Sequence, residues 1–449
     1  MQKFYLILSV FIIVTSQIFP AKIIFRNNPD SSVYKGKYLV KIDSIEIRGN
    51  KITENDIILR ELTFSKGDSV TNYNIEYNRE RIFSLGIFTK VDLYVKKVDE
   101  KNILIIDVAE SWYIYPLPFI ELKDRDWKKF SYGMDVVIQN FRGRNELLQA
   151  RGSLGYDPSI RLSYYRPEII KGSDIFFNSI LSYSNVKNKS LIAEYKYGGQ
   201  FDQKMFTGLI AIGKRFGNFH RFGVDMGYEY VASPVFIKGI SASNERIDRM
   251  PIVGATYTYD SRDLAQFPKN GFYALADIQF KGLGLNNIKY QITTIDFREY
   301  RPVFDDLYFK WRFASRFAFG DLVPYYDFSF LGYQERIRGY FNEVQEGNYY
   351  YLGSVEFYYP LIKDININLD FIPVIPKSLL TYRIALYSEL FGDAGVAKLR
   401  HQKLHMSDFH SGYGLGLTLL ILPYSLVRFE FALNEYSQGE FIFDLGLSF

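Results

Sequence analysis

The sequence contains no cysteine in its 449 residues. This absence excludes disulfide scaffolds, thiolate metal sites, catalytic thiols and the lipid-modified cysteine of a lipoprotein. An excess of charge is also missing, because the formal net charge is +4 and the lysines and arginines are scattered along the chain. The chain therefore does not have the basic stripe that is typical of a nucleic-acid-binding protein.

Long hydrophobic runs are missing as well. No uncharged apolar run reaches the roughly eighteen residues that a membrane-spanning helix needs, although 47% of the residues are hydrophobic and 18% are aromatic. Apolar surface is thus divided among many short segments. The sequence also carries no glycine-rich phosphate loop, so we expect no nucleotide or other cofactor.

Histidine is scarce, and three of the four histidines lie close together. His401 and His405 have the spacing of two ligands on one helix, and His410 follows beside Asp408. No accompanying motif marks a metal site, and nothing orients a base toward the nearby Ser411. We predict a polar surface loop, with no metal and no enzymatic activity, and keep a metal or catalytic loop as the alternative.

The N-terminus predicts the compartment. Lys3 precedes an apolar run over residues 4–14, which is too short to span a bilayer. Small residues at Ser16 and Ala21 offer cleavage positions, so residues 1–21 are predicted to be a secretory signal peptide and residues 22–38 a linker.

A small domain is predicted over residues 39–110. Residues 40–48 alternate as one half-buried strand that stops at Gly49, and Thr53 resembles the N-cap of a first helix. A second helix over residues 73–85 would end at Gly86. Two strands then complete the unit, over residues 88–97 and 103–108. The order strand, helix, helix, strand, strand indicates an α+β domain with helices on one face of a sheet.

Residues 111–449 are predicted to form an all-β barrel. Within residues 307–319, Phe309 and Trp311 share one face, while Lys310 and Arg312 share the other. A soluble sandwich also alternates, but the signal peptide, the segment length near ten and the lack of helical patterns favour a transmembrane barrel of about sixteen antiparallel strands. The predicted strands cover residues 113–121, 131–140, 146–155, 159–167, 174–185, 203–215, 219–231, 250–260, 271–281, 288–300, 306–319, 349–359, 380–391, 411–421, 424–434 and 441–449.

The candidate site is a buried arginine. An even strand number places residues 320–348 in an outer loop and 360–379 in a link on the side of the small domain. The outer loop contains Arg338, Gly339 and Tyr340, and Glu356 points away from the lipid-facing parity of the strand that follows. We predict that the loop folds inward and that Arg338 makes a bidentate ion pair with Glu356, with Asp393 as a second acid.

These motifs together resemble the outer-membrane insertase and translocator superfamily, also called the bacterial surface antigen family. The resemblance rests on the segments 336–340, 353–360, 391–395 and 259–263 and on the terminal Phe449. The small domain, through segments 47–50 and 85–88, resembles a POTRA domain. The resemblance implies one or more POTRA domains before a sixteen-stranded barrel in the bacterial outer membrane, with the POTRA domain in the periplasm. It also implies that the loop arginine lies inside the barrel against acids at 356 and 393.

The closing seam of the predicted barrel is the second candidate feature. Pro116 and Pro118 lie on the first strand and lack the N–H that a ladder needs, and Gly446 offers a kink in the last strand, which ends at Phe449. We predict that these two strands separate laterally, as the family resemblance also implies.

The resemblance implies an assembly, insertion or translocation factor. Its partners would be unfolded outer-membrane or exported client proteins, the lipid bilayer and accessory periplasmic or lipoprotein subunits, with no nucleic acid. A single POTRA-like domain departs from the several domains of the general insertase. A two-partner-type secretion transporter for one exported protein is therefore the alternative, followed by a passive porin and a purely structural envelope protein.

Overall fold

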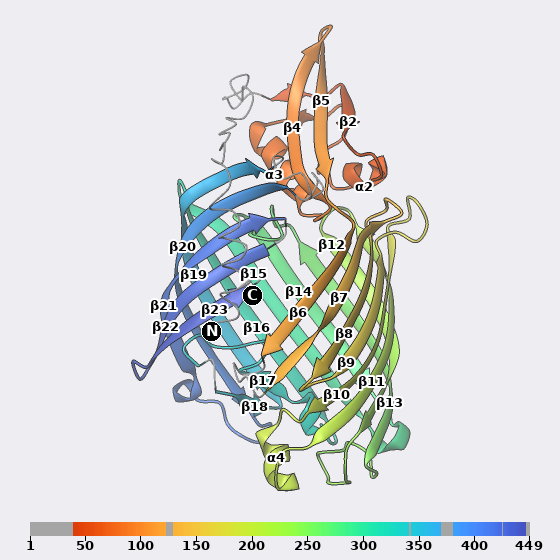
Figure 1. Cartoon of the computed structure of the whole chain (residues 1–449), viewed down its shortest axis with the longest axis vertical. Helices are drawn as coiled ribbons and strands as arrows, with labels where there is room; N and C mark the ends of the chain where they lie inside the picture. The colour runs from red at the N-terminus through yellow and green to blue at the C-terminus, as the bar shows by residue number, and fades with distance from the viewer. Residues whose placement is uncertain (1–38, 123–128, 341–342, 370–379, 424, 446–449) are drawn as a thin grey trace.

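The computed structural model describes residues 39–122, 129–340, 343–369, 380–423 and 425–445. Figure 1 shows two parts, a small mixed domain at one end and a large barrel of tilted strands below it. The predicted signal peptide and the predicted linker lie outside the described residues.

The small domain has a three-stranded sheet in the order β2-β5-β4, with β2 parallel to β5 and β4 antiparallel to it. Helix α3 begins with a capping box in which the Thr71 hydroxyl accepts from the N–H of Asn74 while the Asn74 side chain accepts in return. The elements are β1 (Val40–Lys41), β2 (Ser44–Arg48), α2 (Asn55–Leu59), β3 (Ser69–Val70), α3 (Asn72–Phe83), β4 (Phe88–Val98) and β5 (Lys101–Glu110). The predicted POTRA-like order is confirmed, with β3 as an additional short strand.

Two local predictions in this domain are wrong. The expected strand over residues 40–48 is divided, because β1 pairs with β3 whereas β2 pairs with β5. Thr53 does not cap α2, since its hydroxyl donates to Glu110 Oε1 at 2.7 Å and Glu54 occupies the N-cap position. In both cases a contact with a residue distant in the sequence replaces the local contact that the sequence pattern predicted.

The second part is one sixteen-stranded sheet among the described residues, in the order β23-β22-β21-β20-β19-β16-β15-β14-β13-β12-β11-β10-β9-β8-β7-β6. The strands described in this sheet pair antiparallel, and Figure 1 shows them wrapping around a central space rather than stacking as two layers. The barrel fold is therefore confirmed. Its strands are β6 (Ile114–Leu122), β7 (Phe130–Phe141), β8 (Glu146–Gly155), β9 (Ser159–Arg166), β10 (Ile175–Lys187), β11 (Asp202–Phe216), β12 (His220–Ala232), β13 (Ile247–Asp260), β14 (Gly271–Lys281), β15 (Tyr290–Phe304), β16 (Leu307–Gly320), β19 (Tyr349–Asn368), β20 (Thr381–Lys398), β21 (His410–Leu422), β22 (Ser425–Asn434) and β23 (Gly439–Leu445).

The expected absence of helix after residue 112 is wrong at one loop. Helix α4 (Leu191–Tyr197) lies between β10 and β11, capped by the Ser190 hydroxyl and ended by Gly198 at φ 88°. Within the described part of the chain, no helix combines the length and the apolar character needed to cross a membrane. The predicted link over 360–379 is also too long, because β19 continues through bulges to Asn368.

The faces of the strands alternate as the period of two requires. On β19, Val355, Phe357 and Tyr359 are exposed on the outside, whereas Glu356 and Tyr358 are buried on the inside. The outer face is therefore the lipid-facing face and the inner face lines the lumen.

The small domain packs against one end of the barrel (Figure 1). A continuous hydrophobic cluster joins its core, including Phe83, to Leu264 and Phe267 in the β13–β14 turn and to Tyr387 on the barrel wall. The Tyr77 hydroxyl on α3 also donates to the Ser261 carbonyl at 2.8 Å. The two parts thus share a buried interface.

Candidate functional site

The loop between β16 and β19 packs against the barrel wall. Two short strands within it, β17 (Ser329–Leu331) and β18 (Gln345–Gly347), form a small hairpin sheet. Arg316 on β16 anchors this hairpin by donating to the carbonyls of Asp327 and Phe328 at 2.8 and 2.9 Å. The hairpin therefore positions the segment between its two strands, which contains Arg338.

Arg338 is buried against three carboxylates from three strands. Its Nε and Nη2 donate to the two oxygens of Asp393, each at 2.7 Å, and its backbone N–H donates to Asp393 Oδ2 at 3.1 Å. Its Nη1 donates to Glu430 Oε1 at 2.8 Å and lies 2.7 Å from Glu356 Oε1. We call Arg338 and these three acids the arginine cluster.

The prediction placed the correct residues near one another but assigned the bidentate contact to the wrong acid. Asp393 receives the bidentate pair, and Glu356 shares its charge between Arg338 and Lys310. Glu356 lies next to Lys310 in the β16–β19 register, so the wall supplies its own cation to this carboxylate. The alternation of residues along a strand shows which acids face the lumen. Which of the two acids receives the bidentate contact depends on where the loop backbone lies.

Two glycines allow the β16–β19 loop to approach strand β21 closely. Gly339 has φ 95°, a conformation that side chains with a Cβ rarely adopt. Gly412 on β21 faces the loop, and a Cβ there would lie 1.8 Å from the carbonyl oxygen of Arg338. The guanidinium also lies 3.7 Å from the centre of the Phe391 ring, a cation–π contact. Tyr340, in the same loop, is buried, and its ring meets that of His410 edge-on at 5.0 Å.

A second layer of charge surrounds the arginine cluster. Arg428 lies 3.7 Å from Glu389 and 3.8 Å from Glu430, and Arg312 pairs with both Asp296 and Glu335. Sequence reasoning did not select these residues, although Arg312, Arg428 and Glu430 have the lumenal parity in their strands. A polar cavity of about 110 Å³ adjoins the cluster and reaches Asp444 on β23. The cluster therefore lies beside the last strand of the sheet.

The seam strands β6 and β23 are the two ends of the sheet order. Between described residues, no ladder joins them; Gly446 and Phe449 lie outside the described residues. Gln139 N–H donates to the Tyr113 carbonyl at 2.7 Å, and the β6–β7 register continues without a bulge. Because successive residues of a strand direct their backbone groups to opposite neighbours, the even-numbered residues of β6 face away from β7, toward the edge of the sheet. Pro116 and Pro118 thus each remove an N–H donor from that edge.

The β13–β14 turn links the small domain to the lumen. On one side Ala265 N–H donates to the Ser84 hydroxyl at 2.9 Å, and on the other the Tyr358 hydroxyl donates to the Pro268 carbonyl. Burial raises the pKa of Asp263 in this turn to about 6, even though backbone N–H groups donate to its carboxylate.

An ion pair closes the same interface. Glu80 on α3 lies 2.6 Å from Arg383 on β20 and 2.6 Å from Arg79. Burial alone would raise the pKa of Glu80, but the two guanidinium groups overcome that effect and lower it to about 2.

The histidine loop does not gather into a metal site. His410 Nδ1 lies 3.1 Å from Glu435, whereas Asp408 accepts from the backbone N–H of His405 and pairs with Lys398. In the described ranges, no group of three or more His, Cys, Asp or Glu side chains is arranged to hold a metal ion.

A POTRA-type domain packed on a sixteen-stranded barrel, with a loop arginine buried in the lumen, defines an outer-membrane assembly or transport barrel. The chain belongs to the Omp85 superfamily: residues 140–449 match the Omp85 superfamily domain. Residues 40–111 match the POTRA family described as surface antigen variable number repeat.

Two solved structures share the fold. BamA from Haemophilus ducreyi lacking POTRA domains 1-3 has 16% sequence identity and a TM-score of 0.53, with 91% of this chain and 84% of that chain covered. CdiB from Escherichia coli has 10% identity and a TM-score of 0.51, with 94% of this chain and 92% of that chain covered. No curated protein matches the sequence.

Proposed function

We propose that this protein inserts strand-forming client proteins into the outer membrane through the seam between β6 and β23. The observation that carries the proposal is the edge of β6 that faces away from β7, which lacks two N–H donors at Pro116 and Pro118 and has no ladder to β23 among described residues. A poorly bonded edge separates at low cost and is then free to template a client strand. In this proposal residues 111–449 form the inserting barrel.

The filled lumen supports insertion over passive diffusion. Arg338 draws the β16–β19 loop into the barrel, and the cluster it forms lies beside β23. A passive porin needs an open channel and gains nothing from a buried arginine at this position. We infer that the arginine cluster keeps the loop in place while the neighbouring seam opens.

The small domain, residues 39–110 in this proposal, receives the clients in the periplasm. Its sheet ends in β2 on one side and β4 on the other, and each of these strands has a free edge within that sheet. An extended client segment adds to such an edge by main-chain hydrogen bonds, which recognise strand-forming chains without reading their sequence closely.

The second candidate function is export of one dedicated partner protein. The observation that favours it is the single POTRA-type unit within the described residues, matched once over residues 40–111. One docking module suits one client better than a range of clients. Depletion of the protein followed by profiling of outer-membrane and secreted proteins separates the two functions: loss of many barrels supports insertion, and loss of one exported protein supports export.

The seam itself is tested by cross-linking. The chain has no native cysteine, so Tyr115→Cys and Leu445→Cys can be joined by a bifunctional thiol reagent in the full-length protein in liposomes. We expect the joined protein to lose client insertion and to regain it when a cleavable reagent is cut. The matched control joins Ala276→Cys to Ile295→Cys, register partners on β14 and β15, and should keep full insertion. Full insertion by the seam-locked protein contradicts the proposal.

A further inference from the structure

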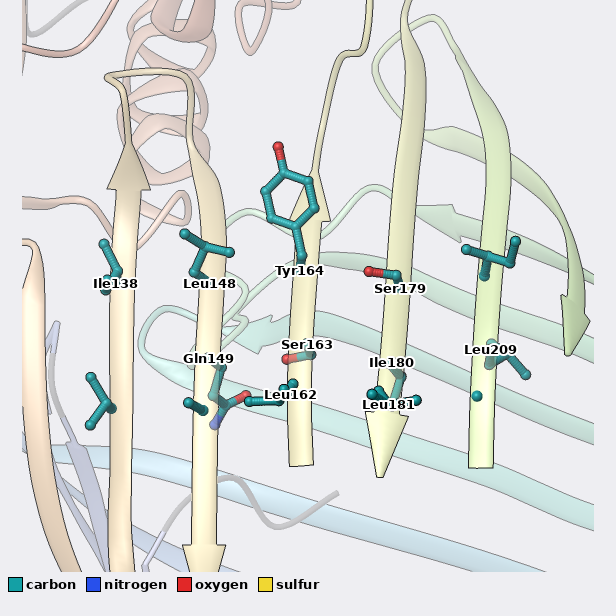
Figure 2. Close-up of a pocket in the computed structure, with 14 residues that line it drawn as sticks. Ile138, Leu148, Gln149, Leu162, Ser163, Tyr164, Ser179, Ile180, Leu181 and Leu209 are labelled. Atoms are coloured by element: carbon teal, nitrogen blue, oxygen red, sulfur yellow. The ribbon is translucent and has the colours of Figure 1, made fainter. Parts of the chain in front are cut away.

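A hollow of about 570 Å³ lies across strands β7 to β11 (Figure 2). Most of its lining has the lipid-facing parity, since Leu162 pairs with Leu181 and Ile210 pairs with Met226, and all four side chains are exposed on the outer surface. Its volume is within the range of pockets that bind small molecules, about 300–1,000 Å³. The hollow therefore opens to the membrane and not to the lumen.

Small residues make the floor of the hollow. Ala150 lies between Val136 and Leu162 in the strand register, and Gly208 lies opposite Leu181. Ser179 occupies the row nearer the POTRA domain, opposite Ile210. Larger aliphatic side chains thus surround a depressed strip, which would take a flexible hydrocarbon chain.

A polar group flanks this strip on the side of the POTRA domain, because Tyr164 lies opposite Ser179 in the strand register. Figure 2 shows the Tyr164 side chain extending away from Leu162, toward the turn between β7 and β8. The Tyr164 hydroxyl donates to Glu146 Oε2 at 3.1 Å and accepts from Arg142 Nη2 at 3.3 Å. This turn packs on the small domain, because Arg144 pairs with Glu54 at 2.8 Å. The polar end is therefore on the periplasmic side of the barrel.

Arg142 has a hydrogen-bond donor available on this side of the strip. Its Nε and Nη2 bond to the buried carboxylate of Glu146, whereas Nη1 makes no hydrogen bond to any other part of the described chain. Its side chain is 49% exposed, and Arg166 lies 3.5 Å from the same Glu146. Two guanidinium groups around one carboxylate leave positive charge on the POTRA side of the apolar strip, and a planar guanidinium suits a phosphate.

We propose that this hollow is a binding site for one glycerophospholipid of the periplasmic leaflet. An acyl chain lies in the strip over Ala150 and Gly208, and the phosphate binds Arg142 Nη1 beside Tyr164. The site is continuous with the lipid-facing surface, and a chain that is apolar along its length and anionic at one end matches its two parts. A uniformly apolar partner surface would leave the charged end unmatched. The proposal does not depend on the seam or on client insertion.

Native mass spectrometry of the full-length protein tests the acyl-chain half. Protein released from nanodiscs of phosphatidylethanolamine and phosphatidylglycerol should retain one phospholipid per chain. Ala150→Phe fills the strip and should lower that occupancy at least tenfold. Ala276→Phe, at an exposed alanine on the outer face of β14, is the matched control and should retain the lipid.

Three results would overturn the acyl-chain half of the site. One is equal loss of lipid in the two phenylalanine variants, and another is no retained lipid in the unmodified protein. The third is a dimer that Ala150→Phe dissociates, which would assign the hollow to a second copy of the chain.

The phosphate half is tested by comparing phosphatidylglycerol with diacylglycerol. The unmodified protein should retain the phospholipid at least tenfold better. Arg142→Gln leaves Glu146 paired with Arg166 at 3.5 Å, so no net positive charge remains there, and this variant should lose the preference while still binding diacylglycerol. Equal retention of both lipids by the unmodified protein would overturn the role of Arg142, as would displacement of the phospholipid by inorganic phosphate alone.

Discussion

At the scale of single residues, the lumen is organised around the charge of Arg338. A guanidinium removed from water is stable only when acids and hydrogen bonds replace its hydration. Asp393, Glu430 and Glu356 do so from three different strands. The loop thereby gains a fixed position on the barrel wall, and Asp393, which receives the bidentate pair, depends most on the arginine in return.

Removal of the arginine should be costly. Arg338→Ala removes the guanidinium that neutralises the buried Asp393, and breaking a buried pair in this way costs on the order of 3 to 5 kcal/mol. We expect the free energy of unfolding in urea to fall by about that amount, and protease cleavage in the β16–β19 loop to accelerate. Arg301→Ala is the control, because Arg301 is 58% exposed and lies 3.7 Å from Glu299; it should change stability by less than about 1 kcal/mol. Equal effects of the two variants would contradict the account of the cluster.

Gly412 tests the close approach of the loop separately from its charge. A Cβ at this position would lie 1.8 Å from the Arg338 carbonyl oxygen, whereas a Cβ at Gly353 would have no heavy atom nearer than 3.9 Å. We expect Gly412→Ala to destabilise the protein by roughly 1 to 3 kcal/mol through overpacking. Gly353→Ala should be close to neutral. Urea unfolding of both variants measures the difference, and similar values would show that the loop does not lie against β21.

At the scale of elements, helix α3 and the β13–β14 turn join the two parts of the molecule. The helix places Glu80 against Arg383 of β20, and the turn places Phe267 against the rings of Tyr358 and Tyr387 at 5.1 and 4.6 Å. One side of this interface is ionic and the other is aromatic. Proton binding is therefore expected to act on the ionic side through Glu80, and on the turn through Asp263, whose pKa is raised to about 6.

The stability of this interface should depend on acid pH through Glu80. The pKa of Glu80 is lowered from 4.5 to about 2. The stability that ionised Glu80 contributes to the native state is therefore lost as the pH falls from about 4.5 toward 2. The change corresponds to at most about 3 kcal/mol. We expect unfolding in urea at pH 3 and pH 6 to differ less for Glu80→Gln than for the unmodified protein.

Glu76→Gln is the control for that pH dependence. Glu76 lies on the same helix and pairs with Arg79, but its side chain is 58% exposed. This variant should keep the pH dependence of the unmodified protein. An unchanged pH dependence in Glu80→Gln would show that Glu80 does not link the interface to proton binding.

At the scale of the whole molecule, the lumen is occupied from both ends. The β16–β19 loop enters from the outer side and bonds to the wall at Asp393, and the β13–β14 turn contacts the lumenal Tyr358 at the side of the small domain. Ion flow through the unmodified protein is therefore expected to be small and intermittent. Release of the loop should widen the path.

Conductance in planar bilayers measures this obstruction. We expect the unmodified protein to show rare openings and Arg338→Ala to show more frequent or larger ones, because the loop has lost its anchor. Arg301→Ala should behave as the unmodified protein does. A steady, large conductance in the unmodified protein would instead support a passive porin.

Much of the fold could be predicted because a strand repeats every two residues. Each of the sixteen barrel strands has a predicted counterpart, and the parity of residues 355–359 gave the correct lumenal position of Glu356. The α+β order of the small domain followed from helix caps and short alternating runs. These signals are local, so they are present in any window of the sequence.

The remaining features depend on neighbours that are distant in the sequence. Thr53 bonds to Glu110 instead of capping α2, helix α4 forms within an outer loop, and Glu430 joins Arg338 across 92 positions of sequence. The hollow over Ala150 and Gly208 arises from strands whose small residues lie in register. Sequence alone thus determined which residues face lipid and which face the lumen, because that choice is made by the period of each strand. Tertiary structure decided which acid holds the arginine, because a charge removed from water pairs with whichever acids the folded backbone brings within reach.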